Sequence, residues 1–583
     1  MSFLFRHSFY AFSLAAIAYA IWIYTIDSPK IIYHCPLDRA GLFDQWFDEN
    51  CYWSTSYAEA REKFVALGNR LREQILLVND EQPLSCGLLG LVDVQSISYD
   101  VSDFEINTTS GGRYFKSLNI KNASDFETTT PEKNTIDALL LTLRIPQKNN
   151  DKESIDIIHS SGVHGVEGYL GSAIQIRFLH EMFLRNEEQL KLESSGSCDS
   201  TDISQKPENK YSDKVRKVLL IHAVNPYGMR HHRRANENNV DLNRNALSPE
   251  AWKNVRSRDP NFVGYVDLDS AINPFRPSVT MDGEIGTDLF SWVEAARKGG
   301  FDGDVTRLQQ RDEEVKQTIY QDRYLPKQFK YVSMTDEFSL RNCIHSWWIE
   351  KINLLDVIAK SLNAITLMGY TNAKRALVAA QYLKPQGMGY GGGAHEFHIN
   401  TCENSIFAIQ HAINDFAGFH LNNYFPNDTA LSSGLETKVF WLDVHTGLGE
   451  YGNYRMLGKD SIPAKDSSEI SWISKLTLLL GDSRLKHGQS SGDGVSEGYD
   501  QTQGFVNDIF LCPPPHCFSY TQEFGTRPGV GVAIAMILEN KGSYVGGREF
   551  GSLSSWAFYP QRLSWRRKTL RGGIDMLDKI LDF

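Results

Sequence analysis

The sequence predicts an α/β protein built on a parallel sheet. Three consecutive segments carry this prediction: a short apolar run at 155–161, an amphipathic helical pattern over 168–193, and a second apolar run at 217–224. A strand, a helix and a strand in this order form a βαβ unit, whose two strands lie parallel in one sheet. We therefore expect a layered fold with helices packed on the sheet.

The remaining elements follow from hydrophobic spacing along the chain. Apolar residues at helical intervals predict a helix over 54–74, and the last residues, 564–583, have the pattern of a closing helix. Segments rich in Ser, Asp, Glu and Lys predict a solvated loop over 191–214. Apolar runs bounded by turn residues predict further strands at 88–101, 135–145, 438–449, 518–526 and 531–540.

The organisation expected is one α/β domain over 28–583 with a large middle insertion. Residues from about 250 to 435 contain charged helix candidates, an apolar helical stretch and a glycine-rich loop at 386–398, but no internal repeat and no sharp domain boundary. The glycine-rich loop lacks the Gly-x-Gly-x-x-Gly spacing that opens a dinucleotide-binding helix, so a nucleotide site is not expected there. The net charge of −11 is diffuse and includes no basic block, which argues against a nucleic-acid partner.

The N-terminus predicts membrane attachment. Residues 8–26 carry no charge, and about 20 apolar residues span a bilayer as a helix. We interpret residues 1–27 as an uncleaved signal anchor that leaves the following domain lumenal or extracellular; cleavage after Ala20, which would secrete the protein, is the alternative. Eight cysteines, an even number, and glycosylation sequons at Asn107, Asn122 and Asn427 agree with that side of the membrane.

A metal site is predicted where two apolar strands end. His164 and Glu167 stand three residues apart on a glycine-rich turn directly after a strand, and His445 follows a second apolar run and precedes another glycine turn. One histidine at a strand end is usually a polar core residue, but two such stretches favour a shared metal. Because a catalytic zinc takes three protein ligands and keeps one position open, we expect one Zn²⁺ per chain, with Asp443 as a partner that orients His445.

Two further stretches indicate what surrounds the metal. The segment 229–245 is rich in basic and amide side chains, and its Asn243-Arg244 pair follows a short apolar step; the arginine side chain can bind a substrate carboxylate through two parallel hydrogen bonds. Glu523 lies inside an otherwise apolar strand, where a carboxylate is costly to bury unless it has a role. A carboxylate beside zinc can accept the proton of an activated water.

Taken together, these motifs resemble the zinc carboxypeptidase superfamily. "HGVE", then "DLNRN", then "DVHTG" and a glutamate in a late strand follow the order of that superfamily. The sequence that flanks these motifs is most similar to an uncharacterised branch of the superfamily, catalogued as a domain of unknown function. The likeness runs from about residue 53 to the end, with only patchy agreement over 250–435. It implies a mixed, mostly parallel sheet flanked by helices.

Carried over by position, the resemblance implies a role for each motif residue. His164, Glu167 and His445 would bind zinc, and Glu523 would be the general base. The remaining roles are oxyanion stabilisation by Arg234, with its neighbour Arg233 as the alternative, and substrate binding by Asn243, Arg244 and Tyr499. Tyr499 matches a substrate-covering tyrosine only loosely, and an ordinary loop tyrosine explains it as well.

The expected function is that of a metallocarboxypeptidase-like zinc hydrolase that cleaves an amide bond next to a free carboxylate. Its substrate would be a peptide. Two alternatives stay open: a zinc amidohydrolase that removes the acyl group of N-acyl amino acids, and a non-catalytic binding protein that keeps the fold.

Overall fold

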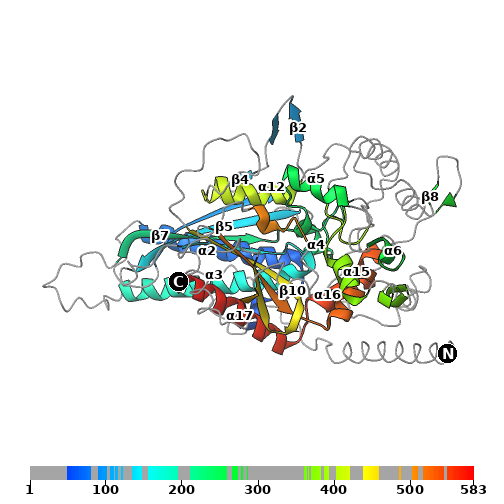
Figure 1. Ribbon diagram of the computed structural model, residues 1–583. Coiled ribbons are helices and arrows are strands. Elements are labelled where there is room, and N and C mark those ends of the chain that lie inside the picture. The colour runs from blue at the N-terminus through cyan, green and yellow to red at the C-terminus, as the bar shows by residue number, and fades with distance from the viewer. Residues whose placement is uncertain are drawn as a thin grey trace, which may run out of the picture.

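The computed structural model shows a layered molecule with a central sheet (Figure 1). It describes residues 49–79, 90–101, 106–109, 112–115, 120–122, 134–146, 155–194, 211–258, 265–273, 278–279, 285–286, 360–363, 365–366, 369–382, 387–392, 402–419, 438–458, 485–486, 502–509, 517–543 and 548–582. The predicted signal anchor at 1–27 and Tyr499 lie outside these residues, as does the charged segment 287–320.

The central sheet has nine strands in the order β12-β11-β13-β10-β6-β7-β5-β1-β4. Two short antiparallel pairs, β2–β3 and β8–β9, stand apart from it. The strand bounds are β1 Gly90–Asp100, β2 Ile106–Thr109, β3 Gly112–Phe115, β4 Ile120–Asn122, β5 Thr135–Pro146, β6 Ile155–Ser161, β7 Tyr211–His222, β8 Ser278–Val279, β9 Ile285–Gly286, β10 Lys438–Tyr451, β11 Tyr454–Gly458, β12 Leu485–Lys486 and β13 Cys517–Gly525.

The centre of the sheet is parallel and its flanks are mainly antiparallel. Strands β13, β10, β6 and β7 run in one direction, whereas β5 and β1 on one side and β11 on the other side pair antiparallel with their neighbours. The predicted βαβ unit is present as β6, helix α3 (Gly168–Ser194) and β7, with Ile157 opposite Val218. The α/β fold with a mixed, mostly parallel central sheet is therefore confirmed.

Helices cover both faces of the sheet and gather beyond the ends of the parallel strands (Figure 1). Helices α2, α3 and α17 lie on one face and α12 lies on the other, while α4, α6, α15 and α16 stand at one end of the molecule. The bounds are α2 Tyr57–Asn79, α4 Pro226–Arg230, α5 Pro249–Arg258, α6 Tyr265–Ile272, α11 Tyr370–Val378, α12 Asn404–His411, α15 Gly529–Ser543, α16 Arg548–Phe558, α17 Leu563–Asp582, the 3-10 turns η2 Glu49–Tyr52, η5 Gly165–Glu167, η6 Leu242–Arg244 and η9 Val506–Ile509, and the π-helical turn η8 Ala412–Phe416.

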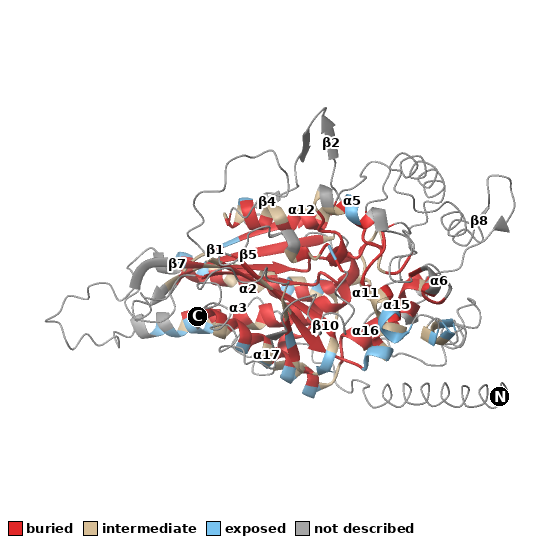
Figure 2. Cartoon of the chain, viewed as in Figure 1, coloured by how far each residue is buried: buried red, intermediate tan, exposed pale blue. Residues whose placement is uncertain are grey.

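The hydrophobic core lies on both sides of the sheet, so most residues of the middle strands are buried (Figure 2). Every residue of β6 is buried. Ile157 belongs to the core beneath α2 and α3, and the next residue, Ile158, belongs to the core beneath α12. Strands buried on both faces consist of continuous apolar runs, which is why these strands could be predicted from the sequence.

One predicted strand is wrong. Residues 531–540 form the middle of helix α15, with Val532, Ala535 and Leu538 buried at helical intervals. A continuous apolar run does not by its spacing distinguish a buried strand from a buried helix. Pro528 precedes the helix, and its carbonyl accepts the first helical hydrogen bonds. Strand β7 also begins at Tyr211, inside the segment expected to be a loop.

Three of the eight cysteines lie in the described part of the chain. Cys51 and Cys517 are disulfide-bonded, and Cys402 is a buried free thiol. Within the same part of the chain, none of the helices combines the length and apolar character needed to cross a membrane.

Candidate metal centre and active site

His164 and Glu167 are held by a tight turn at the end of β6. Gly162 adopts a φ of 74°, in the left-handed region that favours glycine. Gly165 packs against the next turn so closely that a Cβ there would lie 2.0 Å from the carbonyl carbon of Gly228. The main chain of this turn is also bonded to a second loop, because Val166 N–H donates to Arg233 O at 2.9 Å. The turn that carries His164 and Glu167 is thus fixed by main-chain packing.

His445 on β10 and Glu523 on β13 lie at the same edge of the sheet as the turn after β6. β10 lies between β6 and β13, and Val444 on β10 is opposite Ser161, the last residue of β6. His445 is opposite Glu523 in the parallel pair of β10 and β13. Because parallel strands end at one edge of the sheet, residues far apart in the sequence meet there.

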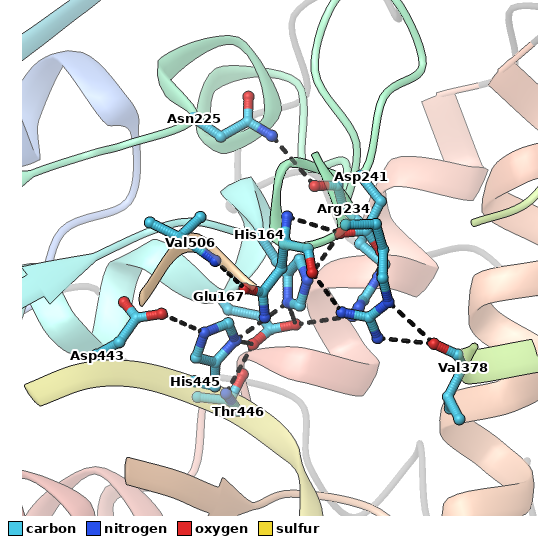
Figure 3. Close-up of polar contacts among 12 residues, drawn as sticks. His164, Glu167, Asn225, Arg234, Asp241, Val378, Asp443, His445, Thr446 and Val506 are labelled. Carbon is cyan, nitrogen blue, oxygen red and sulfur yellow. Dashed lines mark hydrogen bonds and ion pairs between the residues drawn. The ribbon is translucent and has the colours of Figure 1, made fainter. Parts of the chain in front are cut away.

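His164, Glu167 and His445 form one compact cluster (Figure 3). His164 Nδ1 lies 2.9 Å from Glu167 Oε1 and 3.1 Å from His445 Nδ1. His445 Nδ1 lies 3.3 Å from Glu167 Oε2. The candidate ligand atoms are all within 4.8 Å of one another, and all three side chains are buried. The structure therefore brings together the three residues predicted as ligands.

Each histidine of the cluster is oriented by an aspartate on its far side. His445 Nε2 lies 2.6 Å from Asp443 Oδ2, so the predicted contact between these residues is present. His164 Nε2 lies 3.2 Å from Asp241 Oδ1. An N–H at each Nε2 can donate to these aspartates, and in that tautomer the two Nδ1 atoms present their lone pairs to the side where Glu167 lies.

This arrangement fits a divalent metal ion. Two imidazole Nδ1 atoms and one carboxylate converge on a common point, where a bound cation or protons on the rings would balance their negative ends. Two histidines and one glutamate are a ligand set of catalytic zinc sites. Burial would lower the pKa of His445, but Asp443 and Glu167 outweigh burial and raise the pKa well above its usual value. The surrounding carboxylates therefore favour positive charge at this point.

Glu167 is held in place by two partners besides the histidine rings. Thr446 N–H donates to Glu167 Oε2 at 2.8 Å, and Arg234 Nη1 lies 3.3 Å from Glu167 Oε1. Burial raises the pKa of Glu167, but the attraction of His164 and then His445 outweighs it, so the pKa lies well below the usual range. Glu167 is thus held as an ionised carboxylate at the centre of the cluster.

Glu523 has the environment of a proton acceptor near neutral pH. Its Oε1 accepts a hydrogen bond from Leu448 N–H at 2.9 Å. Burial, followed by the negative charge of Glu167, raises the pKa of Glu523 to about 7. A general base is most effective when its pKa is close to the working pH.

The structure separates the two arginines that the sequence left as alternatives. Arg234 lies at the cluster, where its Nε donates to Asp241 Oδ2 at 3.0 Å and its Nη1 approaches Glu167. Arg233 points elsewhere: its Nε lies 2.5 Å from Glu539 Oε1 on α15, and its Nη2 donates to Asn239 Oδ1. Of the pair, Arg234 is the residue that contacts the cluster.

Asn243 and Arg244 lie on the turn η6, next to Asp241, and both are buried. Asn243 Oδ1 accepts from Val506 N–H at 3.0 Å. The guanidinium of Arg244 donates to main-chain carbonyl oxygens, those of Val378 and Asn243. Whether these two residues bind a substrate carboxylate, as the resemblance implies, stays a prediction.

Asp241 is the residue of the site whose role was not predicted from the sequence. Its Oδ1 contacts His164 and accepts from Asn243 N–H at 3.0 Å, while Oδ2 accepts from Arg234. Burial raises the pKa of Asp241, but Arg234 and His164 outweigh burial and hold it well below its usual range. Asp241 caps the turn η6, a common role of Asp at the start of a helical turn, and that role alone does not reveal the contact with His164.

The comparisons with known proteins identify a family for this chain but no activity. No curated protein matches the chain. The sequence model of one family, described as "Protein of unknown function (DUF2817)", matches residues 132–192, 195–315 and 428–572. These ranges contain every side chain of the cluster and cover more than half of the chain. The chain therefore belongs to the DUF2817 family of proteins of unknown function.

Proposed function

We propose that this protein is a zinc-dependent hydrolase of amide bonds, related in its chemistry to the metallocarboxypeptidases. The observation that carries the proposal is the cluster of His164, Glu167 and His445, with both Nδ1 atoms directed inward and a carboxylate behind each histidine. A metal ion at the centre would bind both Nδ1 atoms and the Glu167 carboxylate together, with an aspartate holding each ring from behind. The position of Glu523 beside the cluster adds the proton acceptor that hydrolysis requires.

His164, Glu167 and His445 would hold the zinc ion. When bound, zinc supplies a Lewis acid that polarises a carbonyl group and makes a water molecule acidic near neutral pH. Glu523 accepts a proton from the attacking water and gives it to the departing amine. The guanidinium of Arg234 lies within 3.3 Å of Glu167, so it can donate a hydrogen bond to the substrate oxygen on which negative charge develops.

Two classes of substrate fit this proposal. A peptide with a free C-terminus and an N-acyl amino acid both present an amide next to a carboxylate, and the same ligands and base serve either reaction. A binding protein that retains the fold would keep zinc without turnover. The intact pair of ligand cluster and Glu523 favours an enzyme, because a binding protein has no use for a buried carboxyl group next to the metal ligands.

The experiment is a comparison of the full-length wild-type chain with Glu523→Gln and His164→Ala. The wild type should contain about one zinc per chain and hydrolyse at least one amide substrate in a manner abolished by a chelator. Glu523→Gln should keep the zinc and lose about 10²–10⁴ in turnover, because its amide cannot accept the proton. His164→Ala should lose the zinc.

The outcomes separate the proposals. Unchanged zinc content in His164→Ala contradicts the ligand assignment. Equal turnover in the wild type and Glu523→Gln contradicts the role of Glu523. Zinc in the wild type without hydrolysis of any amide favours the non-catalytic alternative.

We also propose that the domain is translocated and anchored by residues 1–27. The disulfide bonds of Cys51 and Cys517 support this, because disulfides persist in oxidising compartments. In sealed microsomes the domain should resist added protease and should change mobility after glycosidase treatment. Digestion of the domain from the cytosolic side would contradict the proposed topology.

A further inference from the structure

Residues 369–382 and 387–392 are hydrogen-bonded to the site, although they lie outside the ranges that the family model matches. Asp241 N–H donates to Tyr390 O at 2.7 Å, and the side-chain amide of Asn245 donates to Gly391 O at 2.9 Å. Both bonds join the inserted segment to the turn that carries Asp241. The insertion is therefore bonded directly to the residues that surround the metal ligands.

The same segment binds Arg244. Arg244 Nε and Nη2 donate to Val378 O at 3.0 and 2.8 Å, and Nη1 donates to Asn243 O at 2.6 Å. The ring of Phe505 lies under the guanidinium, with its centroid 5.1 Å from Cζ. Each of the three guanidinium nitrogens thus has a main-chain partner, and the residue is only 1% exposed.

Val378 presents its carbonyl oxygen to Arg244 in the manner of a carboxylate. Val378 is the last residue of α11, and the final carbonyl groups of a helix lack partners within the helix and carry partial negative charge. Two parallel N–H groups of Arg244 meet this one oxygen. Arginine uses the same pair of donors to bind a carboxylate, so the helix end occupies the position that a substrate carboxylate would take. Figure 3 shows the carbonyl oxygen of Val378 directed towards the site, where it accepts the two hydrogen bonds of Arg244.

The end of α11 is firmly attached, which argues against easy displacement by a ligand. Tyr382 OH donates to Arg244 O at 2.9 Å, and the Tyr382 ring packs edge-on against Trp252 with centroids 5.6 Å apart. Both aromatic side chains are fully buried. On the other side of α11, Ala373 and Ala376 are buried in a core shared with α6 and α15.

We infer that α11 fills the carboxylate position on Arg244, so that the enzyme acts on amides whose substrates lack a free carboxylate next to the scissile bond. This inference rests on the proposed hydrolase function. The substrate class is then a neutral amide, such as an internal peptide bond or a C-terminally amidated peptide. Arg244 acts as a structural residue that attaches the insertion to the site.

The test uses the zinc-loaded full-length chain and matched substrate pairs: a peptide with a free C-terminus and its C-terminal amide, and an N-acyl amino acid and its amide. We expect kcat/KM for the amide to equal or exceed that for the acid. If Arg244 bound the carboxylate in a buried ion pair, the acid would be favoured by about 30-fold to several thousand-fold. An acid preference of about tenfold or more overturns the inference but keeps the proposed hydrolase. Absence of chelator-sensitive hydrolysis of both members overturns the proposed function itself.

Arg244→Gln provides a second measurement. Glutamine is neutral and shorter, so it gives up the charge and the paired donors to Val378 O. We expect a lower thermal unfolding midpoint, with unchanged zinc content and the same acid-to-amide ratio as the wild type. A selective loss on the acid, with little change in the unfolding midpoint, would assign Arg244 to substrate binding and contradict the inference.

Discussion

The carboxylate of Asp443 should determine how tightly the metal is bound, although it does not face the ligand cluster. Asp443 is buried on β10 with both oxygens engaged: Oδ2 lies 2.6 Å from His445 Nε2, and Oδ1 accepts from Ser160 Oγ at 2.6 Å. Ser160 Oγ is in turn bonded to Trp441 Nε1 at 2.7 Å. The imidazole of His445 is therefore fixed in orientation and tautomer by a chain of bonds that begins in the core.

Two substitutions divide this effect into charge and contact. Asp443→Asn can keep a carbonyl oxygen towards His445, so it loses mainly the charge, and a charge-assisted hydrogen bond is about twice as strong as a neutral one. Asp443→Ala loses both bonds and leaves the imidazole free to change tautomer. Removing such a partner typically weakens metal affinity 10–100-fold. We expect about tenfold for Asn and about 100-fold for Ala, equivalent to about 1.4 and 2.7 kcal/mol.

The assay is a competitive zinc titration against a chromophoric chelator, with circular dichroism as the measure of folding. Asp156→Asn is the matched control, because Asp156 is a buried carboxylate on the neighbouring strand β6 that bonds to Lys217 N–H and not to the cluster. This control should leave the zinc dissociation constant unchanged. A folded Asp443→Ala variant with wild-type zinc affinity would refute the argument that Asp443 orients a metal ligand.

Two further predictions concern stability. Burial, followed by the positive charge of Arg61, lowers the pKa of His222 to about 3. Below about pH 6.5 the unfolded chain binds a proton at His222 that the folded protein does not bind. The free energy of unfolding therefore falls by about 1.4 kcal/mol per pH unit on acidification from about pH 6.5 towards pH 3. Chemical denaturation at pH 7 and pH 5 should show a smaller loss for His222→Leu than for the wild type, and an equal loss contradicts the assignment. Arg233→Ala leaves the buried carboxylate of Glu539 without this partner, so it should destabilise the protein by about 3–5 kcal/mol. Arg234→Ala should reduce turnover and destabilise the protein less, because Glu167 keeps Thr446 N–H and Asp241 keeps Asn243 N–H as donors. Unfolding and turnover measured on both variants must show this contrast, and an Arg233→Ala variant as stable as the wild type would rule it out.

Much of the fold could be predicted because the central strands have a simple hydrophobic pattern in the sequence. The apolar runs of β6, β7 and β10 are continuous because these strands are buried on both faces. The same property explains the error at 531–540, since α15 is also enclosed by other elements and has an equally continuous apolar sequence. Only the packing partners decide between strand and helix in such a segment.

The ligand cluster could be predicted for a different reason. His164, Glu167 and His445 follow strands that are adjacent in the sheet, and the ends of parallel strands meet at one edge. The cluster therefore depends on local motifs and on one topological rule. Asp241 could not be assigned in this way, because it comes from a loop after β7, and its contact with His164 depends on how that loop folds back over the turn at Gly165.

The partner of Arg244 could not be predicted from the sequence. Its position in the motif "DLNRN" implies a free guanidinium that awaits a substrate carboxylate, yet in the structure Val378 is its partner, from a segment 134 residues further along the chain. Nothing in the spacing of residues 369–392 indicates this contact, because a helix end binds through main-chain carbonyls, which every sequence possesses. A motif specifies which side chains are available for chemistry, whereas the insertion decides which of them a substrate can reach. For this protein the ligand cluster and Glu523 thus support the type of reaction, and the end of α11 is the feature from which the class of substrate must be argued.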